Sequence, residues 1–316
     1  MSCPNRTALF NILGSKPAKV QLRSLTTAAA IYIIEAESRG NRGSENMSER
    51  SRKPARQSKR KTDYETILFE VKGPVATITM NRPDKLNACN VKMFREIDNV
   101  LSLVEVDEGI KVVVITGAGD RAFSAGVDFD ELDFKDLKGS SGFVETDART
   151  FRHIENIPQP VIAAVNGYAY GYGCKIAIVS DIAIASEKAR FGLQGIRVGA
   201  VHVITLGRGR SVLGRNRLGY LLLSGDTIDA QKAEDWGLVA RVVPHDRLMT
   251  EVENLAEAIA SYPIFSVRAI KRMLHRGCDD DYRWEDLLTP GLLLMDDLKE
   301  GRRAFKEKRK PKFRGR

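Results

Sequence analysis

The chain has 316 residues, of which 43% are hydrophobic and 29% are charged, so it can bury a substantial core. Its formal net charge is +9, but 13 of its 50 basic residues and 4 of its 41 acidic residues lie within residues 1–61. The remaining residues carry 37 bases and 37 acids. A basic tail on a neutral body argues against a nucleic-acid groove in the folded part, which would need the charge on the domain itself.

The cysteines give no sign of a metal site or of a disulfide framework. Cys3, Cys89, Cys174 and Cys278 are far apart, and no two of them form a C-x-x-C pair. No segment approaches the ~20 apolar residues of a membrane span. We therefore expect a soluble protein in a reducing compartment, with no metal and no membrane as partner.

The basic tail, residues 1–61, allows two interpretations. Residues 1–34 contain no acid and several bases among Ser and Thr, as organellar transit peptides do. Met47, however, is followed by an ordinary polar segment that leads into the domain. The protein could therefore start at Met47, with residues 1–46 belonging to an over-extended reading frame, and we favour this interpretation. We expect a cytoplasmic protein, with a mitochondrial location as the alternative if residues 1–46 are a transit peptide.

Two segments near the start of the neutral part alternate between apolar and polar residues. They cover residues 67–71 and 75–80, and Gly73-Pro74 lies between them. This pattern predicts a β-hairpin. Apolar residues then recur at helical spacing through residues 93–104, which predicts an amphipathic helix.

Two continuous apolar runs follow, at residues 112–115 and 161–165. Runs of this kind, ended by glycine-containing loops, are typical of strands that are buried on both faces. A glycine-punctuated segment then opens a predicted helix over residues 171–179. This alternation of strand, loop and helix predicts an α/β core for residues 62–226.

Beyond about residue 227 the pattern becomes one helix after another. The predicted helices cover residues 230–236, 248–261 and 266–275 and an apolar stretch around residues 287–295. We expect residues 227–316 to form a C-terminal helical region that packs on neighbouring subunits.

Short motifs occur in order along residues 64–313, and together they are far more specific than any one alone. They are Val75 to Pro83 with Asn87-Ala88, Ala122 to Asp128, Pro160 to Ala169, Gly171 to Cys174, Ser180 to Ala185, Ser224 to Asp226, Ala230 to Ala233, Trp236 to Val239, Glu300-Gly301, Ala304-Phe305 and Glu307 to Arg309. This set resembles the enoyl-CoA hydratase/isomerase (crotonase) superfamily. The resemblance implies a spiral of ββα units, C-terminal helices that form a homotrimer or a dimer of trimers, and an acyl-CoA thioester substrate with no separate cofactor.

The resemblance also implies an oxyanion hole, in which two backbone N–H groups point at the thioester oxygen as it becomes enolate-like. By motif position the donors are Val127 and Tyr172. A donor in comparable sites contributes about 3 to 4 kcal/mol. The family usually has glycine at the second position, so Tyr172 either keeps the N–H and crowds the acyl group or packs in a way that spoils the hole.

The hydratases of this family add water with two glutamates, and by motif position this chain has Lys175 and Gly195 in their places. A glycine has no side chain. A protonated lysine already holds the proton that a base should take, unless burial lowers its pKa by several units. Ordinary hydration of a 2-enoyl-CoA is therefore not expected, and isomerisation, decarboxylation or thioester hydrolysis fits better.

His202 is the best candidate for the missing proton-transfer group, with Lys175 as the other. It lies in a segment where several non-hydratase relatives place their acid or base, and its apolar neighbours could tune it. A histidine that is merely packed against a backbone partner is the plainer interpretation of the same residue. His153, on a predicted helix, is interpreted as structural.

For coenzyme A, the resemblance implies contacts near the adenine from the backbone of Ala125 and Asp128. It also implies that Phe305 and Lys308 reach across from a neighbouring subunit, with Lys308 as a phosphate partner. The Asp128 side chain is expected to order its loop and not to take part in the chemistry. The stretch from residue 131 to residue 150, on which the acyl pocket depends, shows no recognisable pattern, so the acyl group is not predicted.

Two alternatives to an acyl-CoA enzyme of the lyase, isomerase or hydrolase type remain at this stage. One is a catalytically silent acyl-CoA-binding or scaffold subunit, motivated by the departures at Tyr172, Lys175 and Gly195. The other is an RNA-binding relative that uses the basic tail.

Overall fold

The computed structural model describes residues 64–132, 134–201, 203–275, 290–291 and 293–312. These residues all belong to one unit of the chain, Ser58–Arg316. The basic tail predicted at residues 1–61, His202 and part of the helix predicted around residues 287–295 lie outside the described residues.

A six-stranded sheet has the order β1-β2-β3-β5-β7-β10. Its strands are β1 (Ile67–Lys72), β2 (Val75–Met80), β3 (Val112–Gly117), β5 (Val161–Val165), β7 (Ile182–Ser186) and β10 (Arg241–Val243). β1 and β2 pair antiparallel, which confirms the predicted hairpin, and the other neighbours pair parallel. The two predicted apolar runs are β3 and β5, and both are buried along their whole length, as parallel strands covered on two faces should be.

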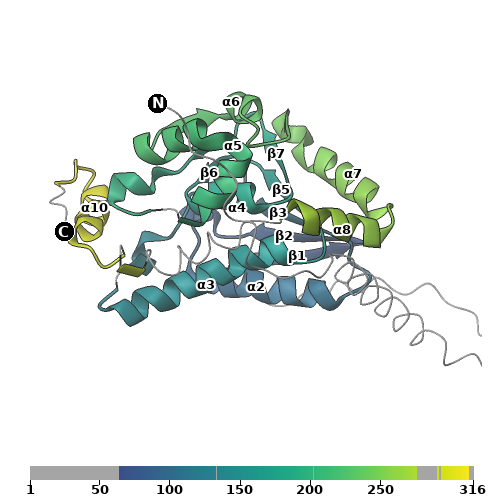
Figure 1. Cartoon of the computed structure of the whole chain (residues 1–316), viewed down its shortest axis with the longest axis horizontal. Coiled ribbons are helices and arrows are strands. Elements are labelled where there is room, and N and C mark those ends of the chain that lie inside the picture. The colour runs from purple at the N-terminus through teal and green to yellow at the C-terminus, as the bar shows by residue number, and fades with distance from the viewer. Residues whose placement is uncertain (1–63, 133, 202, 276–289, 292, 313–316) are drawn as a thin grey trace, which may run out of the picture. The chain divides into compact units, whose positions relative to one another are not determined.

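Helices cover both faces of this large sheet (Figure 1). On one side, α2 (Val91–Val106) contacts β1 and β2, and α3 (Leu137–Asn156) lies against α2. On the other side, α7 (Leu248–Ala260) contacts β3, β5 and β7. Alternate residues of β3 point to opposite sides of the sheet. Val113 packs in the hydrophobic cluster that includes α2, and Val114 packs in the one that includes α7.

A second, four-stranded sheet has the order β4-β6-β8-β9. Its strands are β4 (Ala122–Ser124), β6 (Tyr168–Tyr170), β8 (Arg190–Gly192) and β9 (Thr227–Asp229). β4, β6 and β8 each come directly after a strand of the large sheet, namely β3, β5 and β7. This repeated passage from a long strand to a short strand and then to a helix confirms the predicted spiral of ββα units.

The described residues after residue 226 are mostly helical, but they also include β9 and β10, which the helix-after-helix pattern did not predict. Its helices are α6 (Ala230–Asp235), α7, α8 (Ile264–Leu274) and α10 (Asp296–Lys306), and α5 (Val203–Ser224) precedes them with a break at Gly214. Single 3-10 turns are η1 (Pro83–Lys85), η2 (Phe129–Leu132), η3 (Gln194–Val198) and η4 (His245–Arg247). β9 and β10 extend the edges of the two sheets, so the helical region and the core share their sheets.

A chain of buried charged groups ties α8 to the core. Lys271 Nζ lies 2.8 Å from Asp181 Oδ2, and His275 Nε2 lies 2.6 Å from Asp181 Oδ1. Arg208 connects His275 to Glu155 of α3 through a 2.7 Å ion pair. Because a guanidinium can only donate, His275 Nδ1 accepts from Arg208 and its Nε2–H donates to Asp181. Each of these buried polar groups therefore has a hydrogen-bonding partner, as burial requires.

The outer side of α8 carries large apolar side chains that are exposed. They are Phe265, Ile270, Met273 and Leu274, and Tyr262 precedes them. Among the described residues, no helix is long and apolar enough to cross a bilayer. An exposed apolar helix face on such a protein is typical of a surface that meets another protein.

Candidate active site

Two loops of the small sheet touch each other at the predicted oxyanion hole. A Cβ placed on Gly126, after β4, would lie 3.1 Å from the Tyr170 carbonyl oxygen and 3.5 Å from Gly171 Cα. A Cβ on Gly173 would lie 2.5 Å from the Ser124 carbonyl oxygen, closer than real side chains come. The loops meet because β4 and β6 are parallel neighbours whose carboxyl ends share one edge. The structure thus brings together the two loops that carry Val127 and Tyr172.

The direction of the Val127 amide follows from an isolated parallel bridge between Val127 and Cys89. The Cys89 amide donates to the Gly126 carbonyl at 2.7 Å, and the Asp128 amide donates to the Cys89 carbonyl at 2.8 Å. Successive peptide groups of an extended chain point in opposite directions. The Val127 N–H therefore points away from Cys89.

Tyr172 is the first residue of α4 (Tyr172–Val179), and Gly171 caps the helix with a positive φ of 50°. This confirms the helix predicted over residues 171–179. The first amides of a helix have no carbonyl partner within the helix, and they lie at the positive end of its dipole. The Tyr172 amide is thus placed where a helix best stabilises a developing negative charge.

The Tyr172 side chain packs against α2 and α3. Its ring centroid lies 5.2 Å from that of Phe94 and 5.5 Å from that of Phe151. Its hydroxyl donates a hydrogen bond to Oδ2 of Asp147, a residue of α3 that is 1% exposed. The ring is held on its sides and at its tip.

Lys175 lies one turn further along α4 and is also 1% exposed. Its ammonium nitrogen lies 3.7 Å from Asp147 Oδ2 and 4.0 Å from the centre of the Phe151 ring. It also lies 5.0 Å from the Tyr172 ring, within cation–π range. We call Asp147, Phe151, Tyr172 and Lys175 the Asp147 cluster.

Asp147 was missed at the sequence level, although the sequence does carry a signal for it. Phe143, Val144, Ala148 and Phe151 recur at helical spacing and are buried on α3. Asp147 lies on the same apolar face, and a carboxylate there needs a buried partner. The stretch that seemed patternless therefore contained both the helix and its charged site residue.

Gly195, at the second position predicted for a glutamate, lies on η3. The Gly171 amide donates to the Gly192 carbonyl at 2.9 Å, so η3 begins close to the N-terminus of α4. A Cβ on Gly301 of α10 would lie 2.4 Å from the Val198 carbonyl oxygen, so α10 packs directly on η3. The proposed proton-transfer residue His202 follows this turn and lies outside the described residues.

Asp128 orders the first loop, as predicted. Its carboxylate receives Arg82 Nη2 at 2.7 Å and Lys85 Nζ at 3.1 Å, and it also accepts from the Asp130 amide. Burial alone would raise the pKa of Asp128, but the hydrogen bonds from Arg82 and Lys85 outweigh it and lower that pKa. Asp128 is thus an ionised anchor of the loop.

The backbone predicted to meet the adenine is held in place by the same loop. The Ala125 amide donates to the Leu86 carbonyl at 2.9 Å, and the Asp128 amide is used by Cys89. The Asp128 carbonyl in turn accepts from the Glu131 amide at 2.9 Å, so the backbone of this loop is held by hydrogen bonds on both sides.

α10 brings Phe305 to the same loop within one chain. Its ring centroid lies 4.8 Å from that of Phe129, and Lys306 Nζ lies 2.8 Å from Asp130 Oδ1. Phe305 is nonetheless 61% exposed in this single chain. That Phe305 and Lys308 serve a neighbouring subunit stays a prediction.

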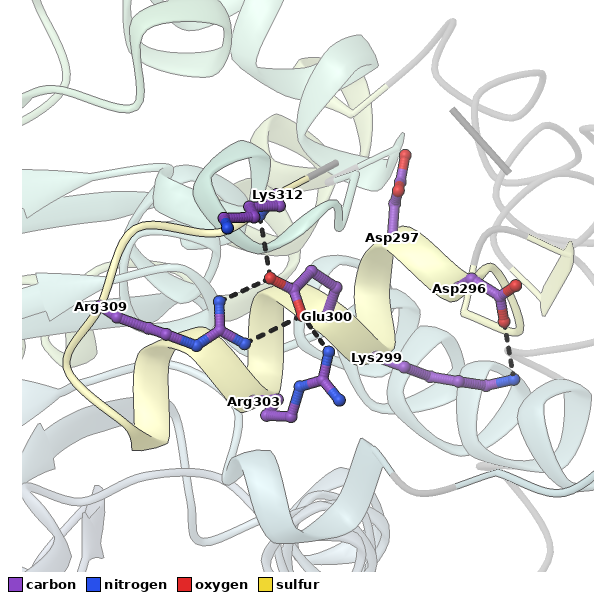
Figure 2. A pocket seen from close by; sticks show the side chains of 7 residues that line it. All are labelled: Asp296, Asp297, Lys299, Glu300, Arg303, Arg309 and Lys312. Atoms are coloured by element: carbon purple, nitrogen blue, oxygen red, sulfur yellow. Dashed lines mark hydrogen bonds and ion pairs between the residues drawn. The ribbon is translucent and has the colours of Figure 1, made fainter. Parts of the chain in front are cut away.

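Glu300 of α10 holds the segment that follows this helix through Arg309 and Lys312 (Figure 2). Arg309 binds its carboxylate in a bidentate manner at 2.7 and 3.0 Å, and Arg303 and the Lys312 amide bind it as well. The hydrogen bonds from Arg309 and Arg303 lower the pKa of Glu300. The hollow around it is lined by charged side chains, namely Asp296, Asp297, Lys299, Glu300, Arg303, Arg309 and Lys312. It is a polar surface site and does not suit an acyl chain.

Two sheets wound as ββα units, with two glycine-rich loops meeting at a helix N-terminus, define the class of crotonase-fold proteins. The family model for enoyl-CoA hydratase/isomerase matches residues 70–316. The chain therefore belongs to the enoyl-CoA hydratase/isomerase family.

Curated relatives and solved structures agree with this assignment. The chain is 38% identical over 265 residues to a probable enoyl-CoA hydratase of Rhizobium meliloti (strain 1021), covering 80% of this chain and 99% of the relative. It is 35% identical to a short-chain-enoyl-CoA hydratase of Clostridium acetobutylicum, covering 78% of this chain and 97% of the relative. The crystal structure of an enoyl-CoA hydratase from Mycobacterium avium subsp. paratuberculosis superposes with a TM-score of 0.71 at 30% identity, covering 79% of this chain and 99% of that one.

Proposed function

We propose that the chain transforms an acyl-CoA thioester by stabilising an enolate-like thioester oxygen between the backbone amides of Val127 and Tyr172. The observation that carries this proposal is the contact between the Gly126 and Gly171 loops, with the Val127 amide directed away from Cys89 and the Tyr172 amide at a helix N-terminus. Pre-oriented amides in such a site stabilise developing charge without reorganisation.

We further propose that the reaction is not hydration, but isomerisation, decarboxylation or thioester hydrolysis. The Lys175 ammonium lies beside the Asp147 carboxylate and inside an aromatic wall, so it is a buried cation and not a carboxylate base. Gly195 supplies no side chain. The proton-transfer role then falls to His202.

Hydration is the second candidate, and the names of the curated relatives favour it. A panel of CoA esters separates the two: crotonyl-CoA, a 3-enoyl-CoA, a malonyl-type ester and a saturated ester, with products identified by mass spectrometry. We expect no gain of water on crotonyl-CoA and turnover of one of the other esters. A 3-hydroxyacyl-CoA product would contradict our proposal, and no product from any ester would favour the catalytically silent subunit.

The variant His202→Ala, assayed with the CoA ester that the wild type turns over, tests the proton-transfer role of His202. Turnover should fall about 10²- to 10⁴-fold, because that is the usual contribution of a positioned acid or base. CoA binding should stay intact. His153→Ala is the matched control, since His153 Nδ1 is engaged by Asp98 at 2.8 Å and belongs to the α2–α3 interface. Equal turnover in both variants would rule out the role of His202.

We also propose that the chain forms a homotrimer or a dimer of trimers, with Ala125, Asp128, Phe305 and Lys308 contacting coenzyme A. The exposed apolar side chains of α8 support self-association, because such a face is costly to leave in water. Light scattering coupled to size exclusion should give three or six times the mass of one chain. A monomer would contradict this assembly.

A further inference from the structure

The side chain of Tyr172 begins next to the amide that would hold the thioester oxygen. The amide nitrogen and Cβ of one residue are both bonded to the same Cα, so they lie about 2.5 Å apart. An oxygen hydrogen-bonded to that amide lies about 2.9 Å from the nitrogen. The first carbons of the acyl group must therefore pass close to the base of the Tyr172 side chain.

The ring of Tyr172 is held at its sides and at its tip. Phe94 and Phe151 contact its sides with centroids at 5.2 and 5.5 Å, and the hydroxyl binds Asp147. Asp147 is itself held near Lys175, at 3.7 Å from the ammonium. Moving the ring aside would leave a buried carboxylate without this donor, which is costly.

These contacts hold the Tyr172 ring between the proposed amide donors and a wall of aromatic side chains on α2 and α3, namely Phe94 and Phe151. Phe143 extends the wall behind Phe94, with ring centroids 6.4 Å apart. The family usually has glycine at the Tyr172 position, where no side chain would occupy this volume.

We propose that Tyr172 determines acyl-chain length, and that Asp147 and Lys175 position it, so that the chain accepts CoA thioesters of short acyl groups, up to about four carbons. This inference rests on the proposed function, because it takes the Tyr172 amide as a thioester contact. It goes further in naming the substrate class and the residue that selects it.

Calorimetric titration of the wild-type protein with CoA, acetyl-, butyryl-, octanoyl- and decanoyl-CoA tests the inference without any mutation. In an open acyl tunnel, each buried methylene would tighten binding about fourfold. We expect affinity to rise from CoA to butyryl-CoA and to stop rising beyond it. A steady gain up to decanoyl-CoA, with CoA itself bound, would overturn the length limit but not the proposed function. If CoA and its esters do not bind at all, both fail.

Tyr172→Ala should open the site, so that decanoyl-CoA binds at least tenfold more tightly than it binds the wild type, while acetyl-CoA changes by less than about threefold. Tyr172→Phe keeps the ring but loses the hydrogen bond to Asp147, so it should relax the length limit only in part, with a smaller gain for decanoyl-CoA than in Tyr172→Ala. Tyr168→Ala is the matched control, because Tyr168 stacks on Tyr170 on β6 and is 38% exposed. A length profile that is the same in Tyr172→Ala, Tyr168→Ala and the wild type would overturn the assignment. If Tyr172→Ala does not fold, the wild-type series decides.

Discussion

Two buried lysine–aspartate pairs lie in the part of the chain that the structure describes, and they differ in the distance between the charged groups. Lys271 and Asp181 are 2.8 Å apart, and Lys271 Nζ also donates to the Ile154 and Gln159 carbonyls. Lys175 and Asp147 are 3.7 Å apart and lie beside aromatic rings. The first pair joins α8 to the large sheet, whereas the second lies behind the proposed oxyanion hole.

The comparison shows how similar residues can be used for different purposes. A directly hydrogen-bonded pair that links distant elements stabilises the fold, because removal of one partner leaves a buried charge unpaired. The more widely spaced pair, Lys175 and Asp147, lies beside Tyr172, whose amide is a proposed donor of the oxyanion hole. It is therefore placed to hold the Tyr172 side chain. The two pairs should therefore respond differently to the same substitution.

The largest expected effect comes from Asp181→Ala. Its loss leaves the Lys271 ammonium and His275 without their carboxylate, so the free energy of unfolding should fall by about 3 to 5 kcal/mol. Urea unfolding followed by circular dichroism measures it. Glu253→Ala is the control, because the Lys72–Glu253 pair is exposed and should matter little. Similar losses in both variants would contradict a structural role for the buried pair.

Asp147→Ala should lower stability as well, and unlike Asp181→Ala it should also impair function. The free energy of unfolding should also fall by about 3 to 5 kcal/mol, because the buried Lys175 ammonium loses its carboxylate and the Tyr172 hydroxyl loses its acceptor. Turnover of the active CoA ester should fall about tenfold or more, since a displaced Tyr172 misplaces the site. In Asp181→Ala, turnover per folded molecule should stay near the wild-type value. The reverse pattern would remove the distinction between the two pairs.

The smallest expected effect is the pH dependence of the Asp181 pair. Burial alone would raise the pKa of Asp181, but the hydrogen bond from His275 and the charge of Lys271 outweigh it and lower that pKa. Such a carboxylate stabilises the fold above its unfolded pKa of about 3.9, and this contribution is lost as the pH falls through the lower folded value. Below about pH 4, stability should thus fall more steeply in the wild type than in Asp181→Asn. Parallel curves in stepped urea titrations would contradict this.

The sequence predicted the parts of the fold that depend on local periodicity. The hairpin, α2, β3, β5 and α4 all follow from alternating, helical or continuous apolar spacing. The three-residue strands β9 and β10 are too short to show a period, and they exist because β8 and β7 offer them an edge. Long-range pairing of this kind cannot be read from local pattern.

The candidate site divides in the same way. Val127 and Tyr172 could be named from motifs, because their loops are set by nearby glycines. Asp147 could not, since its partners Tyr172 and Lys175 lie on another helix and are distant in sequence. A charged residue on the apolar face of α3 was the available signal.

The infrared carbonyl stretch of a bound thioester tests the central claim most directly. Butyryl-CoA labelled with ¹³C at the thioester carbonyl would be compared free in water and bound to the protein. Two amide donors aimed at the oxygen polarise the C=O bond, so the account predicts a shift to lower frequency on binding. A bound ester whose carbonyl frequency is unchanged or higher would contradict an oxyanion hole at Val127 and Tyr172.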